Sequence, residues 1–183
     1  GTGAHEILIE TPQHRRSLAE LSLEAVTQVL EAYAQRMEDL KRDRRFRSIF
    51  IFKNQGVLAG AGLPGHAHSQ VIGLPVPPKA LKEMLDGAHR YYQLRERCVF
   101  CDIIRQEVNQ GIRLISENED VVVIAPFASR FPFETWILPK TNDPFLEDAQ
   151  KHEYVSLSKI LRELLLRQEK VLTNPPYNLM VHN

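Results

Sequence analysis

The stretch "GLPGHAHSQVIGLP", residues 62–75, constrains the fold more than any other part of the chain. Two histidines and a glutamine alternate there with small or apolar residues, directly after a glycine-rich segment. Side chains alternate between the two faces of a β-strand, so residues 66–74 are predicted to form a strand. His66, His68 and Gln70 then share one face. Exposed strands usually carry Thr, Lys or Glu, so this polar row indicates a reactive edge or a metal site.

The row and the loop before it have the parts needed for chemistry on phosphate. A neutral imidazole is a good nucleophile near neutral pH, and a hydrogen bond to its second ring nitrogen holds one tautomer. The amide of Gln70 can donate to a phosphoryl oxygen. Backbone N–H groups of "NQGVLAGAGLPG" (54–65) can hold phosphate charge. The pattern therefore favours attack by His68 on phosphorus, with a solvent-facing polar row as the alternative.

Outside this stretch, strand-like and helix-like segments follow one another along the chain. In one predicted strand, Phe46, Phe50 and Phe52 share a face. The order predicts an α+β fold of two similar units that meet near residues 76–97. Alternation predicts strands at 5–10, 45–54, 133–140 and 177–183 and a strand pair within 113–127, and helical spacing predicts helices at 18–41, 79–97 and 149–173.

Composition narrows the class of protein. The 183 residues suffice for one ordinary domain or two small ones, and 23 basic residues balance 23 acidic ones. A zero net charge argues against a nucleic-acid partner. No apolar run reaches membrane-spanning length, and residues 1–14 lack a signal-peptide pattern. Cys98 and Cys101 are the only cysteines and form no disulfide framework, so a reduced, cytoplasmic setting is expected.

Several motifs together resemble the galactose-1-phosphate uridylyltransferase family of the histidine-triad superfamily. The H-x-H-S-Q form is most similar to the branch that includes ADP-glucose phosphorylase. The matching stretches are "HEILIETPQH" (5–14), "FIFKNQGVLAGAG" (50–62), "HAHSQVIGLPVPP" (66–78), "CVFCDII" (98–104), "VVVIAPFASRFPFETWILPK" (121–140) and "PPYNLMVHN" (175–183).

The resemblance implies histidine-triad-like antiparallel sheets flanked by helices, in two related halves that are each incomplete. Residues 1–80 would be the C-terminal part of the first half and would carry the nucleophile strand. Residues 81–97 would be a connecting helix, and residues 98–183 the N-terminal part of the second half. The chain is thus expected to be truncated at both ends.

The resemblance also implies a nucleotidyltransferase with a covalent nucleotidyl-histidine intermediate. His68 would be the nucleophile and Gln70 would hold the phosphoryl oxygens. The leading interpretation is uridylyl transfer between UDP-glucose and a hexose 1-phosphate in galactose metabolism. Adenylyl transfer from ADP-glucose to phosphate is one alternative, and a non-catalytic nucleotide-binding module is another. The substrates would be a nucleotide sugar and a sugar phosphate or phosphate, a homodimer is expected, and substrate contacts would come from Phe52, Asn54, Gly60 and Gly62.

Zinc is the cofactor that the resemblance implies. His14 and His66 match two ligands of the family's structural site, whose cysteine pair precedes this segment; hydrogen-bonded histidines at a sheet edge are the alternative. Cys98 and Cys101 match a second pair of ligands, and Asn142 takes the place of a histidine ligand there. Two buried free cysteines are the alternative, and a redox role would need a strand before the motif and a helix after it.

Overall fold

The structure is a computed structural model that describes residues 2–14, 17–61, 66–142 and 145–182. The chain divides into two compact units, residues 1–77 with 144–183 and residues 78–143. Each unit contains its own antiparallel sheet flanked by helices, which confirms the predicted α+β class. Residues 144–183 lie in the same compact unit as the first part of the chain, and the predicted division into segments 1–80, 81–97 and 98–183 stays a prediction.

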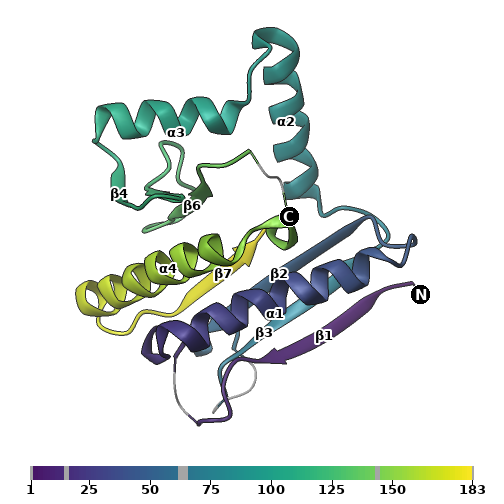
Figure 1. The fold of residues 1–183 in the computed structure, drawn as a ribbon, viewed down its shortest axis with the longest axis vertical. Coiled ribbons are helices and arrows are strands. Elements are labelled where there is room, and N and C mark those ends of the chain that lie inside the picture. The colour runs from purple at the N-terminus through teal and green to yellow at the C-terminus, as the bar shows by residue number, and fades with distance from the viewer. Residues whose placement is uncertain (1, 15–16, 62–65, 143–144, 183) are drawn as a thin grey trace. The chain divides into compact units, whose positions relative to one another are not determined.

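A four-stranded antiparallel sheet forms the centre of the larger unit (Figure 1). Its order β1-β3-β2-β7 places the histidine strand β3 between two neighbours. The last strand of the chain pairs with β2, with Lys53 opposite Leu179. The strands are β1 (Ala4–Ile9), β2 (Ser48–Gln55), β3 (His68–Leu74) and β7 (Tyr177–Val181).

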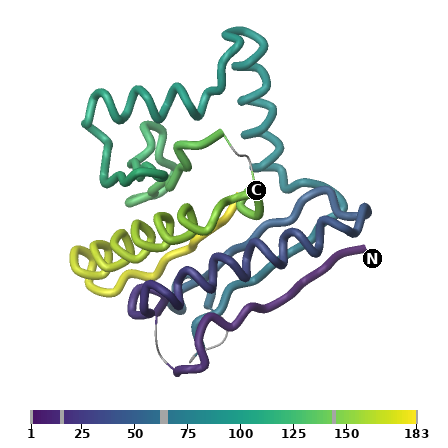
Figure 2. Tube along the Cα trace, viewed as in Figure 1, coloured from purple at the N-terminus to yellow at the C-terminus, as the bar shows by residue number. Residues whose placement is uncertain are grey.

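Two long helices, α1 (Leu23–Lys41) and α4 (Lys151–Leu172), run side by side along this sheet (Figures 1 and 2). Thr27 Oγ1 donates to Ser158 Oγ across the helix pair at 3.0 Å, and both side chains are buried. Apolar side chains at helical spacing give each helix a buried stripe. The core of the unit includes Val26, Leu30, Tyr33 and Met37 of α1, Ile51 and Val71 of the sheet, and Ile160, Leu161 and Leu165 of α4.

The first helix begins later than the sequence predicts. A capping box at Ser17 starts only a short 3-10 turn, Leu18–Glu20, in which the Ser17 N–H donates to the Glu20 carboxylate at 2.6 Å. The chain then becomes extended at Leu21. Ser22 caps α1 itself and accepts from the Ala25 N–H at 3.2 Å. The predicted helix at 18–41 starts at the capping box of Ser17, whereas α1 starts after the second capping serine, Ser22.

Phe46 lies before β2 and not on the face that Phe50 and Phe52 share. Its ring comes within 3.1 Å of the position that a Cβ on Gly73 would occupy. Gly73 shares a face with Val71, because both alternate with Gln70 and Ile72 along β3. A Cβ at residue 73 would crowd the Phe46 ring, so glycine suits this position. The predicted row of three phenylalanines is wrong at its first member.

The smaller unit has two helices, α2 (Lys79–Arg95) and α3 (Val99–Gln110), and a three-stranded sheet. The sheet order is β4 (Leu114–Glu117), β5 (Val121–Ile124) and β6 (Trp136–Pro139), and all four β5 residues are buried. The sequence does not predict α3. This helix begins directly after Cys98 and ends at Gly111, whose φ of +68° suits a C-terminal glycine.

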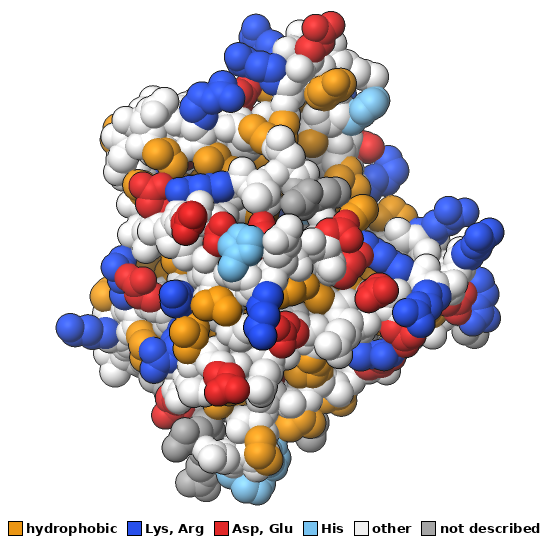
Figure 3. Space-filling view, in the orientation of Figure 1, with side chains coloured by type: hydrophobic (Ala, Val, Ile, Leu, Met, Phe, Trp, Pro, Cys, Tyr) orange, Lys and Arg blue, Asp and Glu red, His pale blue; other side chains and the backbone are white. Residues whose placement is uncertain are grey.

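No helix within the described residues is long and apolar enough to cross a membrane. On the face drawn in Figure 3, lysine and arginine side chains are interspersed with aspartate and glutamate. This mixture agrees with the zero formal net charge of the chain.

Candidate functional site

His68 is the first residue of β3, and the structure fixes its ring from within the strand. Its Nδ1 donates to the backbone carbonyl of His66 at 3.0 Å, and the residue is 8% exposed. A carbonyl oxygen can only accept, so Nδ1 carries the hydrogen. In the neutral ring the lone pair is then on Nε2, which is the nitrogen available for nucleophilic attack.

Gln70 lies two residues further along β3, on the same face of the sheet. His5 Nε2 donates to Gln70 Oε1 at 2.7 Å, which leaves the amide nitrogen to act as a donor. His5 is not among the residues predicted for the site. The strand register could have indicated His5. It places His5 opposite Ile72, and Ile72 shares a face with Gln70 because the two are two residues apart in β3.

Phe52 stands directly opposite Gln70, in the next strand. Its ring is stacked against Phe50, with ring centroids 6.1 Å apart. Met180 of β7 and Ile7 of β1 extend this row to either side, and these two side chains are 55% and 51% exposed. The outer face of the sheet therefore offers an open apolar row beside the His68 and Gln70 pair.

Asn54 holds the loop that follows β2. Its Nδ2 donates to the Gly60 carbonyl at 3.4 Å, and its Oδ1 accepts from Asn178 Nδ2 at 2.7 Å. The same Asn178 nitrogen donates to the Ala59 carbonyl at 2.9 Å. Asn178, missed by the sequence analysis, thus ties β7 to the loop. Its own signal was the alternation of "YNLMV", which places Asn178 on the face of Met180.

The described part of the loop uses its N–H groups internally. Ala59 and Ala61 donate to the Gly56 carbonyl and Gly60 donates to the Val57 carbonyl, at 3.0–3.2 Å. Gly60 has a φ of +87°, a backbone conformation in which a residue with a side chain would be strained. The predicted contact at Gly62 lies outside the described residues, as do residues 63–65. Substrate contacts of Phe52, Asn54 and Gly60 stay predictions.

His66 is not part of the strand, although the sequence predicts a strand from 66 to 74. Because β3 starts at His68, the two histidines need not share a face. The His66 ring instead lies against the ring of His14, with centroids 4.0 Å apart. The buried His66 Nδ1 has no hydrogen-bond partner among the described residues. Two adjacent imidazoles, one with an unpaired buried nitrogen, fit half of a tetrahedral zinc site.

Cys98 and Cys101 come together at the start of α3, in the smaller unit. The Cys101 N–H donates to Cys98 Sγ at 3.4 Å, and Cys101 Sγ donates to Asn142 Oδ1 at 3.1 Å. Cys98 is exposed and Cys101 is half-buried, so the alternative of two buried thiols is wrong. A helix precedes the motif as well as following it, which is not the strand-first arrangement of a redox motif.

The two thiols differ in acidity. Burial disfavours the Cys98 thiolate, but hydrogen bonds from the Cys101 thiol and from the N–H groups of Cys101 and Phe100 outweigh it and lower the pKa of Cys98. The hydrogen bond to Cys98, and then burial, raise the pKa of Cys101. Asn142 meets Cys101 at the position where the resemblance predicts a histidine ligand, and a neutral amide oxygen is a weaker zinc ligand than imidazole.

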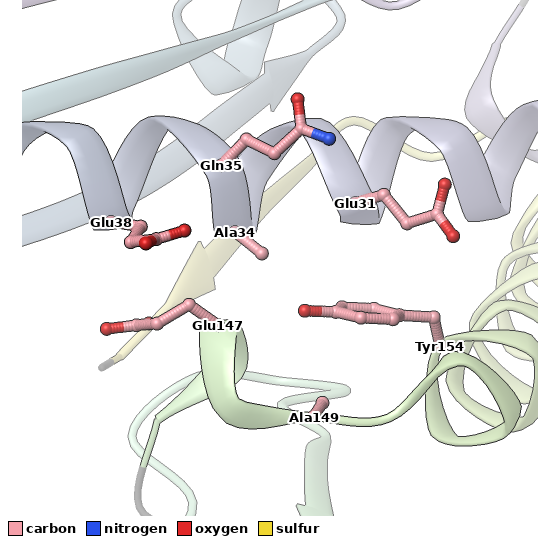
Figure 4. Close-up of a pocket in the computed structure, with 7 residues that line it drawn as sticks. All are labelled: Glu31, Ala34, Gln35, Glu38, Glu147, Ala149 and Tyr154. Carbon is pink, nitrogen blue, oxygen red and sulfur yellow. The ribbon is translucent and has the colours of Figure 1, made fainter.

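A pocket of about 360 Å³ lies elsewhere in the larger unit, between α1 and the segment before and at the start of α4 (Figure 4). Glu31 and Glu38 extend from α1, and Glu147 and Tyr154 come from the opposite wall. Lys41 pairs with Glu147, and the Tyr154 hydroxyl donates to a backbone carbonyl at 2.6 Å. Carboxylates repel phosphate groups, so this pocket does not suit the predicted substrates.

Comparison with known proteins identifies the family of the chain. The family model described as galactose-1-phosphate uridyl transferase, N-terminal domain, matches residues 1–78, and that of the C-terminal domain matches residues 84–183. The chain belongs to the galactose-1-phosphate uridyl transferase family, whose named relatives are nucleotidyltransferases.

Two curated relatives show how far the likeness extends. The chain is 34% identical to ADP-glucose phosphorylase of Arabidopsis thaliana over 182 residues, which is 100% of this chain and 50% of that protein. It is 28% identical to galactose-1-phosphate uridylyltransferase of Thermotoga maritima over 179 residues, covering 97% of this chain and 55% of the relative. The chain therefore spans about half the length of these relatives.

Solved structures give the same fold. A crystal structure of the Arabidopsis thaliana ADP-glucose phosphorylase with bound ADP-glucose matches with a TM-score of 0.92 at 33% identity, covering 100% of this chain and 57% of that one. A uridylyltransferase mutant matches with a TM-score of 0.93 at 27% identity, covering 99% of this chain and 60% of the other. The predicted histidine-triad-type fold of this family is thus confirmed.

Proposed function

We propose that the protein carrying this chain transfers nucleotidyl groups between phosphate-bearing substrates, through a nucleotidyl intermediate on His68. The observation that carries the proposal is the hydrogen bond from His68 Nδ1 to the His66 carbonyl, which leaves Nε2 as the nucleophilic atom. Membership of the family supports the same reaction class.

In the first step the Nε2 lone pair attacks the α-phosphorus of a nucleotide sugar. The Nε2–P bond forms while the bond from the α-phosphorus to the bridging oxygen breaks, and hexose 1-phosphate leaves with that electron pair. Positive charge develops on the imidazole, and the His66 carbonyl stabilises it through Nδ1–H. The Gln70 amide nitrogen donates to a phosphoryl oxygen, because His5 occupies the amide oxygen.

In the second step a phosphate oxygen of the acceptor attacks the same phosphorus. The Nε2–P bond breaks, and the pair returns to His68. A hexose 1-phosphate acceptor gives a new nucleotide sugar, and inorganic phosphate gives a nucleoside diphosphate. The protein's contribution to such transfers is mainly positioning and charge stabilisation. A non-catalytic module would not need the tautomer of His68 to be held in this way.

Uridylyl transfer from UDP-glucose is the donor chemistry that we propose first. Adenylyl transfer from ADP-glucose to phosphate is the second candidate, favoured by the 34% identity to ADP-glucose phosphorylase across the whole chain. The apolar row of Phe52 and its neighbours would lie against either base, since both are flat. The proposal includes a homodimer and a cytoplasmic location.

Zinc is part of the proposal as a structural ion. His14 and His66 would hold it near the start of the reactive strand, where it would tie the segment at residue 14 to that strand. Cys98 and Cys101 would be ligands of a second ion, for which Asn142 offers only an amide oxygen. Elemental analysis of the natural full-length protein, with His66→Ala and Cys98→Ser variants, would count the ions at each site.

Trapping the intermediate tests the function directly. The natural full-length protein is incubated with ADP-glucose or UDP-glucose labelled at the α-phosphorus, and the labelled peptide is identified by mass spectrometry. We expect a nucleotidyl adduct on His68 with one of the two donors, released by hexose 1-phosphate or phosphate. An adduct on another residue, or no adduct and no turnover with either donor, would overturn the proposal.

A further inference from the structure

A buried ion pair lies beneath the reactive strand, on the face of the sheet opposite to Gln70. Lys53 Nζ is 2.9 Å from Glu10 Oε2, and the two side chains are 1% and 0% exposed. Removing two charges from water carries a large desolvation penalty, and well-packed apolar residues often stabilise a fold equally well. The pair is therefore poorly explained by stability alone, and its position next to His68 suggests a role in the site.

The other atoms of the pair are also engaged. Ser69 Oγ and the Tyr33 hydroxyl both donate to Glu10 Oε1, the latter at 3.3 Å, and the two hydroxyls contact each other. Burial, and then the charge of Glu10, raise the pKa of Tyr33, so that its hydroxyl stays a donor. The cluster joins α1, β2, β3 and the residue that follows β1.

This cluster reaches the backbone of the reactive segment. The Glu10 N–H donates to the Ala67 carbonyl at 2.9 Å, and Lys53 Nζ donates to the His68 carbonyl at 3.4 Å. The carbonyl of His66, which comes just before Ala67 in the chain, accepts a hydrogen bond from Nδ1 of the His68 ring. Three consecutive carbonyls around the nucleophile thus each receive a donor. Two of those donors are the Glu10 backbone N–H and the Lys53 ammonium, which the Glu10 carboxylate holds in place.

We propose that Glu10 and Lys53 are positioning residues, which hold the backbone of residues 66–68 so that the His68 ring keeps its hydrogen bond and points Nε2 at phosphorus. The inference rests on the proposed function of His68. The neighbouring carbonyls set the direction of the Cα–Cβ bond, and this direction sets the ring. A misplacement of about 1 Å can slow a reaction on the order of a hundredfold.

The test uses the double variant Glu10→Gln/Lys53→Met in the natural full-length protein. Lys53→Met alone would leave a buried carboxylate without its counter-ion and would destabilise the fold. The double variant removes both charges at similar volume. Thr27→Val is the matched control, since it removes a buried hydrogen bond between α1 and α4 that touches neither β2 nor β3.

Two measurements are made on each protein, with the donor that labels His68 in the wild type. Single-turnover kinetics follow formation of the nucleotidyl-histidine, and ¹⁵N-histidine NMR reports the tautomer of the His68 ring without turnover. In the double variant we expect the rate constant to fall about ten- to a hundredfold. The donor concentration that half-saturates the single-turnover rate should change less than threefold, and the Nδ1–H tautomer should lose its dominance. Thr27→Val should keep the wild-type rate and tautomer.

The outcomes separate the two proposals. A folded double variant that forms the adduct at the wild-type rate with an unchanged tautomer would overturn the positioning role. Equal rate losses in the double variant and in Thr27→Val would overturn it too, because the effect would then be general loss of stability. Failure of the wild type to form any adduct would contradict the proposed function instead, and in that case an unchanged tautomer in the double variant would still overturn the positioning role.

Discussion

On the outer face of the four-stranded sheet, His68 and Gln70 stand beside side chains such as Ile7 and Met180 that are about half exposed. On the inner face, Glu10 and Lys53 are buried, and their charged groups bond to each other, to Ser69 and to the His68 carbonyl. Among the described residues, the His68 ring is held by its hydrogen bond to the His66 carbonyl, and the Gln70 amide is held by the hydrogen bond from His5. The inner groups form a connected network.

This difference has a physical consequence. Exposed polar groups lose little free energy when a neighbour is removed, because water replaces it, whereas buried charges cannot be rescued by water. Changes to the half-buried and exposed groups of the outer face should therefore alter the reaction and leave stability intact, and a change at the buried His68 should do so where the donor to the His66 carbonyl is kept. Changes on the inner face should alter stability, with an additional effect on the reaction only where they touch residues 66–68.

The largest effect is expected from His68→Asn, on the outer face. The variant keeps a donor for the His66 carbonyl but has no nucleophilic nitrogen. Turnover should fall by at least about 10⁴-fold, measured with both nucleotide sugars, while the thermal midpoint stays near that of the wild type. His89→Asn on α2 is the control and should leave both unchanged. Residual turnover above a tenth of the wild-type rate would contradict the nucleophile assignment.

Lys53→Met on the inner face should show the opposite pattern. It leaves the Glu10 carboxylate buried and unpaired, which costs about 3–5 kcal/mol of unfolding free energy. Urea unfolding of the full-length protein measures this loss. Restoring charge balance with Glu10→Gln in the same molecule should recover most of it. A single variant as stable as the wild type would mean that water or a rearranged side chain pairs with Glu10.

Gln70→Ala is expected to lower kcat about 10²–10³-fold, the usual result of removing one donor to a developing oxyanion. Because Gln70 is on the outer face and half-buried, the free energy of unfolding should change by less than about 1 kcal/mol. Steady-state kinetics and urea unfolding of the same preparation give both values. A kcat within threefold of the wild type would exclude Gln70 as the phosphoryl-holding residue.

Gly60→Ala tests the loop that Asn54 and Asn178 hold. The φ of +87° makes any side chain strained, so we expect a loss of about 1–2 kcal/mol in stability together with a raised KM for the donor. Gly111→Ala is the matched control, because its φ is +68° at the end of α3 in the other unit. That variant should lose similar stability without a change in KM. If Gly60→Ala and Gly111→Ala had the same KM for the donor, the loop would not contribute to donor binding.

The smallest effect is expected from His5→Leu. Losing one hydrogen bond to the Gln70 amide oxygen frees the amide to rotate, which should lower kcat about two- to tenfold. Stability should hardly change, because His5 is exposed. Combining His5→Leu with Gln70→Ala tests whether His5 acts through Gln70. If it does, the double variant should be no slower than Gln70→Ala alone. A further additive loss would show that His5 acts on the substrate independently of Gln70.

Much of the fold could be predicted because local patterns agree with the final packing. Alternation located strands near their observed positions, and helical spacing located α1, α2 and α4 to within a few residues. The exceptions have physical causes. α1 begins after Ser22 and not after Ser17, and the Phe46 ring packs against Gly73. α3 begins inside the C-x-x-C motif, whose spacing indicates chemistry and not a helix.

The sequence alone identified the family and placed His68 and Gln70 on one strand face, because residue identity and a period of two are local properties of the chain. Tertiary structure decided which atoms meet. Only pairing between strands placed His5 on Gln70 and Asn178 on Asn54, and only a strand start at His68 brought His66 to His14. Glu10 and Lys53 are 43 residues apart, and no local pattern shows that their charges share one buried site beneath the nucleophile.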